Sequence, residues 1–395
     1  MNSVTKQDPL FDLIKSLSKA EKRNFKLYAT RTSGNHEAKF IQMFDALDSL
    51  SEYDEAKIMK RCPVSKLQLS NMKAHLYNQI LVSLRLLNVQ HNSILQIREQ
   101  MDFARILYDK GLYKQSLKIL EKAKSMAQSC QQNTMVLDAI EFQNIIESLY
   151  LNRSMADNVE FTRQAKELCS RVENCNELSA ISLHLYSLHQ QLGYVRSEKD
   201  LNLINQYFSF RLEQYKNSSL SFTEKFYYYQ AMVWYNYILH NFKNCYRYAR
   251  KWLDLFEQNP NMKNTMYDNY IHGFSRLLDG LFLMNDYERM VSALDKFQLE
   301  RENISESSDN VKLIADTIHY YNTINLYCME GNFELGVQII PEVELFINEN
   351  LNNLELHKRM LFYYKIACLY FGNCQYEECI ASLGRIIETR DHTIR

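Results

Sequence analysis

A short turn pattern recurs along this chain and limits its fold more than any other feature. Each copy is a polar residue or glycine, one spacer and then an aromatic residue, and it closes a stretch of helical periodicity. The aromatic residues of the four C-terminal copies are 45, 46 and 43 residues apart, and an earlier copy lies 129 residues, three periods of 43, before them. The five copies are residues 111–113, 240–242, 285–287, 331–333 and 374–376. A fixed period of this length predicts stacked helical hairpins, because one hairpin cannot bury its apolar face alone.

The composition favours long helices with short connections. Only nine Gly and four Pro occur in 395 residues, so few positions force a helix to end. Hydrophobic residues make up 46% of the chain and charged residues 24%, which indicates a globular protein rather than a disordered one. We therefore predict an all-α fold.

The first hairpin, Ile97–Lys110 and Tyr113–Ser129, resembles a tetratricopeptide repeat (TPR). Ala104 falls at the small position of the first helix, and Ser116 falls at the packing position of the second. Cys245, Met290, Gly336 and Cys379 align with Ser116 in the later copies. The resemblance implies an α-solenoid of about seven TPR-like hairpins over residues 97–390, curled into a right-handed superhelix with a concave inner wall. The chain departs from the family in its longer period and in the loss of most diagnostic Trp, Leu-Gly and Pro positions.

We expect two parts, an N-terminal helical head over residues 1–95 and the TPR-like α-solenoid over residues 96–395. Ser18 and Glu21 fit a capping box that starts a second helix in the head. Spacing places two further hairpin turns near Asn152–Asn158 and Gly193–Asp200. The whole arrangement resembles a group of bacterial TPR proteins to which no reaction is assigned, on the basis of residues 13–23 and 76–81 of the head.

The resemblance also implies which residues line the concave wall, namely the second, fifth, ninth and twelfth positions of each first helix. Such a wall, rich in Tyr and Trp, suits a peptide held by aromatic anchors and backbone hydrogen bonds. The resulting hypothesis is a non-enzymatic scaffold that binds a protein or peptide. The implied lining residues are Arg98, Met101, Arg105, Tyr108, Tyr227, Gln230, Trp234, Tyr237, His272, Ser275, Asp279, Phe282, Tyr321, Asn325 and Tyr364.

No sequence motif indicates catalysis, a cofactor or a metal. The few glycines form neither a P-loop nor a dinucleotide-binding pattern. Cys368, Cys374, Cys379 and His357 are residue types that bind zinc, but their spacing matches no compact zinc motif and core cysteines are the better interpretation. His184 and His189 point about 140° apart on a helix and make a poor ligand pair. We therefore expect no cofactor, no metal and no enzyme, although a pocket with perturbed titratable groups would escape a reading of the sequence.

The longest uncharged run, Phe226–Phe242, is shorter than the roughly 20 apolar residues that span a bilayer and contains several polar side chains. It predicts a buried, aromatic-rich helix and no membrane insertion. Nine scattered cysteines and an N-terminus without a signal-peptide pattern favour a reduced, cytoplasmic protein.

The head supports a second hypothesis. Residues 54–61, a turn at 63–65 and residues 69–87 approximate a helix-turn-helix, in which Lys66, Gln68, Ser70, Asn71 and Lys73 would face a DNA groove. The basic bias of residues 1–95, fourteen Lys/Arg against nine Asp/Glu, is too weak to indicate nucleic acid by itself. The alternative function is a cytoplasmic regulator whose head binds DNA or a signalling partner while the repeats sense a ligand, a layout similar to that of bacterial regulators of the Rap type.

Overall fold

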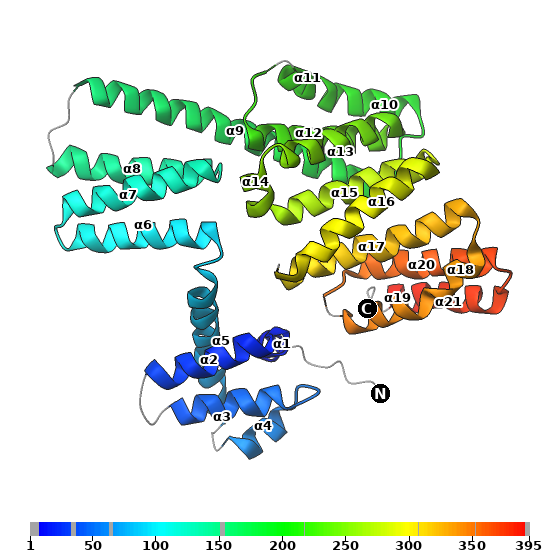
Figure 1. Ribbon diagram of the computed structural model, residues 1–395, viewed down its shortest axis with the longest axis horizontal. Coiled ribbons are helices and arrows are strands. Elements are labelled where there is room, and N and C mark those ends of the chain that lie inside the picture. Colours follow the sequence, from blue (N-terminus) through cyan, green and yellow to red (C-terminus); the bar gives the residue numbers. More distant parts are fainter. Residues whose placement is uncertain are drawn as a thin grey trace. The chain divides into compact units, whose positions relative to one another are not determined.

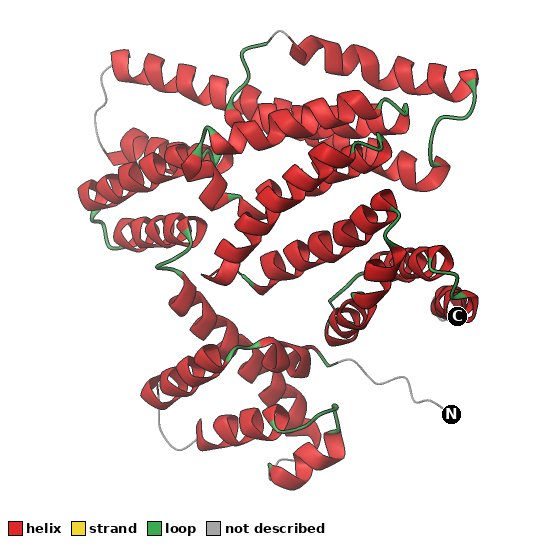
Figure 2. Cartoon of the chain, turned by 45° about the vertical axis from the view of Figure 1, so that its right-hand side comes forward, coloured by secondary structure: helices red, strands yellow, loops and turns green. Residues whose placement is uncertain are grey.

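The computed structural model describes residues 8–32, 37–62, 66–150, 155–216, 218–306, 308–351 and 353–391, of which 86% are helical. Figure 2 shows helices joined by loops, with no strand in this described part of the chain. The prediction of an all-α fold is confirmed. The chain divides into two compact units, residues 1–127 with 139–151 and residues 128–138 with 152–395.

The first unit begins with five helices that enclose a core of their own. Phe25, Phe44 and Leu47 are fully buried in it. The predicted capping box starts the second helix, because the backbone N–H of Ser18 donates to Glu21 at 2.8 Å and that of Glu21 donates to the Ser18 hydroxyl at 3.2 Å. The five helices are α1 (Pro9–Ser16), α2 (Lys19–Thr32), α3 (Glu37–Asp48), α4 (Glu55–Arg61) and α5 (Lys66–Asn88).

Three helices follow, α6 (Ser93–Asp109), α7 (Tyr113–Ser129) and α8 (Asn133–Tyr150). Ala104, Leu120, Phe142 and Ile146 form their shared core. The hydroxyl of Ser116 is fully buried and donates to the carbonyl of Ala104 at 2.7 Å, so a small side chain ties α7 to α6. The division between the two units falls within α7 and α8.

Helix α9 (Met155–Leu192) corrects one expectation. The two expected turns, near Asn152–Asn158 and Gly193–Asp200, belong to two successive hairpins, so two helices were expected between them. A single helix of 38 residues occupies this stretch instead. No Gly or Pro occurs from Met155 to Leu192, so no residue forces the helix to end. The part of the expected turn at 152–154 lies outside the described residues. The second expected turn is present, since Gly193 has a φ of +70° and follows the end of α9.

The rest of the second unit is a run of helix pairs that follow one another in Figure 1. Helix α12 packs on α9 and α13, α13 on α15, α15 on α17, and α17 on α20. The helices are α10 (Glu198–Ile204), η1 (Asn205–Ser209, a π-helical turn), α11 (Phe210–Lys216), α12 (Phe222–Ile238), α13 (Phe242–Glu257), α14 (Pro260–Thr265), α15 (Tyr267–Leu283), α16 (Tyr287–Glu302), η2 (Asn303–Glu306), α17 (Asp309–Glu330), α18 (Phe333–Gln338), α19 (Ile340–Glu349), α20 (Leu356–Gly372) and α21 (Tyr376–Asp391).

All five copies of the turn pattern adopt one backbone geometry. The first residue of each copy has a left-handed φ, between +53° and +74°. The spacer N–H then donates to the carbonyl five residues earlier, the hydrogen bond of a Schellman turn, and the aromatic residue is the first of the next helix. The left-handed residues are Gly111, His240, Asn285, Gly331 and Cys374. Glycine and short polar residues tolerate this conformation best, which explains the pattern.

The aligned packing site of the second helices is buried in every copy. Ser116, Cys245 and Met290 are at most 1% exposed, Cys379 is 8% exposed, and Gly336 is also buried. A Cβ added at Gly336 would lie 2.6 Å from a methyl group of Leu369. The prediction that these positions pack closely is confirmed.

Candidate binding surface

Aromatic side chains from α9 and α12 gather at one place in the second unit. We call His189, Tyr194, Trp234 and Tyr237 the aromatic cluster. The ring of Tyr237 lies 5.8 Å from that of Trp234 and 5.0 Å from that of His189, with edge-to-face geometry in both cases. The ring of Tyr186 covers Trp234 from α9 at 4.9 Å. These contacts hold Trp234 half-buried in a fixed orientation.

The turn after α9 brings Tyr194 to this cluster. The N–H of Val195 donates to the carbonyl of Ile238 at 3.1 Å, which joins the turn to the end of α12. The Tyr194 hydroxyl then lies 3.3 Å from the Tyr237 hydroxyl. The Nδ1 atom of His189 lies 3.2 Å from the Gly193 carbonyl, and burial lowers the pKa of this histidine, so we expect a neutral ring with the proton on Nδ1.

Charged side chains continue the surface from α12 to α15. The guanidinium of Arg276 lies 4.8 Å from the centre of the Trp234 ring, and its Nη1 atom is 3.2 Å from Oδ2 of Asp279. The side chains of Arg276 and Asp279 remain 26% and 21% exposed. Burial raises the pKa of Asp279, while Arg276 and Lys365 counteract the shift. The positive charges of both neighbours thus favour the carboxylate form.

Lys365 on α20 completes this charged group. Its side chain is 9% exposed, and its Nζ atom lies 4.3 Å from the centre of the Phe282 ring and 5.4 Å from that of Tyr321. Burial lowers the pKa of Lys365, and Asp279 is among the groups that raise it. We call Arg276, Asp279, Tyr321 and Lys365 the charged cluster.

Two tyrosine hydroxyls border Asp279. Burial and then the nearby Asp279 carboxylate raise the pKa values of Tyr237 and Tyr321. Both phenols therefore stay protonated and can donate hydrogen bonds at neutral pH. The combined surface offers aromatic faces, two neutral hydroxyl donors, one carboxylate and two cations, which suits binding more than covalent chemistry.

The structure brings four of the sequence-predicted lining residues together, namely Trp234, Tyr237, Asp279 and Tyr321. His272 belongs to the same edge of α15, since Arg276 is close enough to lower its pKa. Phe282 lies beneath Lys365. Gln230 and Ser275 are half-buried on the same helices.

Three other predicted positions on these helices differ from one another in burial. Asn325 is 1% exposed and its Nδ2 donates to Asn322 within α17 at 3.3 Å, so it is a buried side chain and not part of an accessible wall. Tyr227 is half-buried among core side chains and packs on Phe226 at 4.9 Å. Tyr364 is 52% exposed.

The remaining predicted lining residues, Arg98, Met101, Arg105 and Tyr108, belong to the first unit, where Met101 packs against the core shared by α6, α7 and α8. Arg105 lies 3.9 Å from the centre of the Phe142 ring, and Tyr108 packs against Phe142 edge to face at 5.4 Å. Arg98 is exposed. Arg105 is also exposed, so its guanidinium covers an aromatic pair while keeping access to solvent.

One residue of the DNA-binding alternative forms contacts within the head. Lys73 forms an ion pair with Asp8, donates to the Tyr53 hydroxyl at 2.9 Å and is 20% exposed, so its ammonium is engaged inside the head. Gln68, Ser70 and Asn71 are exposed on α5. Lys66 is the first residue of α5, and the expected turn at 63–65 lies outside the described residues.

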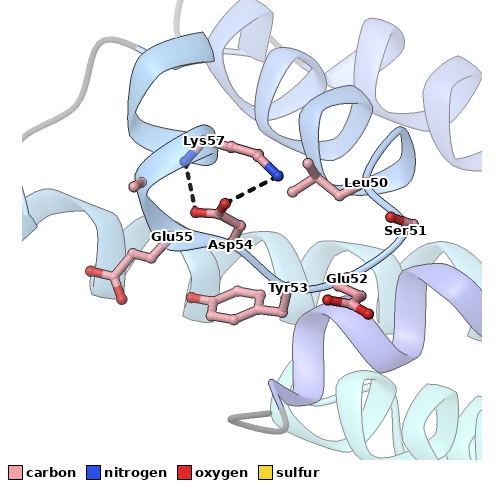
Figure 3. A pocket seen from close by; sticks show the side chains of 8 residues that line it. Leu50, Ser51, Glu52, Tyr53, Asp54, Glu55 and Lys57 are labelled. Atoms are coloured by element: carbon pink, nitrogen blue, oxygen red, sulfur yellow. Dashed lines mark hydrogen bonds and ion pairs between the residues drawn. The ribbon is translucent and has the colours of Figure 1, made fainter. Parts of the chain in front are cut away.

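A hollow of about 470 Å³ in the head lies at the start of α4 and is lined by residues 50–57. Figure 3 shows that its Asp54 carboxylate faces Lys57. This carboxylate caps α4 by accepting from the Lys57 N–H at 3.1 Å, and its other oxygen is 3.3 Å from the Lys57 ammonium. Asp54 and Lys57 therefore stabilise the start of α4.

Within the described residues, no group of three or more His, Cys, Asp or Glu side chains could hold a metal ion. Of the cysteines considered as zinc ligands, Cys379 is buried at the helix-packing site and Cys374 is the exposed left-handed residue of the last turn. No helix in the described part of the chain has the length and apolar character to cross a bilayer.

Comparison with protein-family models finds none that matches the chain, and comparison with curated proteins finds no similar sequence. A function for the chain is therefore inferred from the geometry of the aromatic and charged clusters.

Proposed function

We propose that the chain is a TPR-like α-solenoid and a non-enzymatic scaffold that binds a protein or peptide. The five identical Schellman turns, at spacings of 43 to 46 residues or a multiple of 43, support a repeated hairpin unit. The shared buried site at Ser116, Cys245, Met290, Gly336 and Cys379 supports it as well.

One observation carries the binding function. Trp234, Tyr237, Arg276 and Tyr321, from three helices, are half-buried and in contact or close to one another. Trp, Tyr and Arg are the residue types enriched at the energetic centres of protein interfaces, because each combines a large apolar area with a polar end. The surface that we propose to bind a peptide comprises the aromatic and charged clusters.

We also propose a reducing, cytoplasmic location. All nine cysteines are free, and several lie singly within helices at packing positions. A protein of an oxidising compartment would be expected to use such residues in disulfides.

The test uses Trp234 as a reporter. The chain has two tryptophans, and Trp252 is a core residue that is 2% exposed. In a Trp252→Phe background, emission therefore reports on Trp234 alone. We expect pools of blocked heptapeptides to shift this emission saturably. In fluorescence polarisation with labelled pools, Tyr237→Ala should weaken binding about tenfold or more, as expected at an interface hot spot.

Tyr207→Ala is the matched control, because Tyr207 is 63% exposed on η1 and its ring packs on Phe208, which belongs to neither cluster. We expect it to bind the pools like the parent. Circular dichroism of each variant ensures that lost binding does not reflect lost helix. Equal pool binding by Tyr237→Ala and the parent, both folded, would show that the proposed surface is not the binding site.

A further inference from the structure

Lys365 is a buried cation without a counter-ion. The residue is 9% exposed, and its Nζ atom, which forms no ion pair or hydrogen bond with the described residues, keeps some contact with solvent. Its neighbours are the rings of Phe282 and Tyr321, the thiols of Cys328 and Cys368, and the Asp279 carboxylate. An ammonium that is largely desolvated and has no counter-ion gains free energy when an anion binds to it.

The charges of the cluster do not cancel. Asp279 is the single carboxylate, and it forms its ion pair with Arg276. Lys365 is close enough to Asp279 for each to shift the pKa of the other, but the two do not form an ion pair. When Arg276 and Lys365 are protonated and Asp279 is ionised, the cluster has one positive charge in excess. Burial lowers the pKa of Lys365 and raises that of Asp279, and one incoming carboxylate beside Lys365 would favour the protonated form of that lysine.

The surroundings narrow the class of anion. A phosphate monoester carries roughly −1.5 to −2 charges at neutral pH, which exceeds the single excess positive charge of the cluster, whereas one carboxylate matches it. The hydroxyl donors of Tyr237 and Tyr321 suit a carboxylate, which accepts up to about four hydrogen bonds. The rings of Trp234, Phe282 and Tyr321 suit apolar atoms on either side of that charge.

Building on the proposed peptide-binding function, we propose that Lys365 anchors the side-chain carboxylate of an internal Glu or Asp of the bound peptide. The apolar neighbours of that acidic residue pack against Tyr321 and Trp234. Arg276 remains paired with Asp279, so Lys365 supplies the charge selectivity. The partner is therefore an acidic segment with flanking apolar residues.

The experiment compares labelled, N-acetylated and C-amidated heptapeptide pools whose central residue is fixed as Glu, Gln, Lys or phosphoserine. A fifth pool has central Gln and a free C-terminal carboxylate. The full-length protein is titrated with each pool by fluorescence polarisation. We expect the Glu pool to bind about tenfold more tightly than the Gln pool, the difference expected for one charge-assisted hydrogen bond.

Lys365→Met keeps a long unbranched side chain and removes the ammonium. It should still fold, because replacing an unpaired buried charge by an apolar group is often neutral or stabilising. We expect this variant to bind the Glu and Gln pools equally. Lys243→Met, at an exposed position on α13, is the matched control and should keep the preference for Glu.

Each other outcome overturns the proposal in a distinct way. Equal binding of the Glu and Gln pools by the parent removes the anion site but leaves peptide binding intact, whereas no binding of any pool removes both. Tighter binding of the Lys pool would assign recognition to Asp279. Tightest binding of the phosphoserine pool, or of the pool with a free C-terminus, would replace the internal carboxylate by that group. A preference for Glu that survives in Lys365→Met would exclude Lys365.

Discussion

The guanidinium of Arg276 lies over the Trp234 ring, 4.8 Å from its centre, and the two residues come from different helix pairs. This contact joins the aromatic cluster of α9 and α12 to the charged cluster of α15, α17 and α20. Because Nη1 of Arg276 also pairs with Oδ2 of Asp279 at 3.2 Å, two contacts fix the position of its guanidinium. The surface is thus held in place before any ligand arrives, which lowers the entropy cost of binding.

The first prediction concerns this contact. Arg276→Met removes the cation over Trp234 and the partner of Asp279, so we expect the free energy of unfolding to fall by about 1 kcal/mol. Trp234 emission should change in the Trp252→Phe background. Urea denaturation followed by circular dichroism measures the first effect, and the emission spectrum measures the second. Arg276→Lys retains the charge and should lose less stability; an unaltered spectrum in Arg276→Met would contradict the stacking.

The turns provide a second prediction. Gly331 has a φ of +73°, and a Cβ added there would contact nothing within 4 Å, so Gly331→Ala tests backbone conformation alone. We expect a loss of about 1 kcal/mol in the free energy of unfolding, since a left-handed conformation strains a residue with a Cβ. Cys374 has a φ of +60°, and Cys374→Gly should stabilise by a similar amount. Chemical denaturation of both variants measures these opposite changes, and a shift of the same sign in both would refute the explanation.

The turns were predictable because their geometry restricts residue choice. Few residue types other than Gly adopt a positive φ readily, so the residue types in the turn pattern predict a left-handed backbone. The five residues with this conformation are Gly111, His240, Asn285, Gly331 and Cys374. The extent of α9 was not predictable from the period. The length of the repeat predicts how many hairpins fit in the chain, but it does not predict where each helix ends. A segment without Gly or Pro can stay helical where a connection between two hairpins was expected, as α9 does from Met155 to Leu192.

The resemblance implied Trp234, Tyr237, Asp279 and Tyr321 as lining residues, and these four lie near one another in the structure. That they bind a peptide stays a prediction. The resemblance misplaced Asn325, whose side chain turns into α17 and is buried. It also missed Arg276 and Lys365, although the sequence holds a local signal: Lys365 is the one charged residue in the apolar run 361–371. A single charged residue in an apolar run indicates a charged side chain that is buried and that requires an oppositely charged partner or a ligand.

A third prediction concerns close packing between the last helix pairs. At Gly336, an added Cβ would lie 2.6 Å from a methyl group of Leu369 and 3.2 Å from the Cβ of Tyr327. We expect Gly336→Ala to lower the free energy of unfolding by about 1–3 kcal/mol, the usual cost of overpacking. Gly384→Ala is the matched control, because nothing lies within 4 Å of an added Cβ in α21. It should stabilise by up to about 1 kcal/mol through helix propensity, and thermal melts of the two variants should move in opposite directions.

The fourth prediction is a loss of stability in mild acid. Burial, followed by Arg276 and Lys358, lowers the pKa of His272 to about 4, and Asp268 and Glu355 oppose this shift. The unfolded chain protonates the same histidine near pH 6.5. Between pH 6.5 and 4 the unfolded state therefore binds more protons than the folded state, so stability is complete above pH 6.5 and falls as the pH drops through this window. From pH 7 to 5 the contribution of His272 is about 2 kcal/mol.

His272→Gln removes the titrating group and keeps a polar side chain of similar size. Urea denaturation at pH 7 and pH 5 should show a smaller drop in the free energy of unfolding for this variant than for the parent. His319, whose pKa burial also lowers to about 4, retains its own share of the acid sensitivity, so the dependence should weaken without vanishing. His184→Gln alters an exposed histidine on α9 and should leave the dependence as in the parent. If His272→Gln and His184→Gln retain equal acid sensitivity, then burial, together with Arg276, does not hold His272 neutral in the folded state.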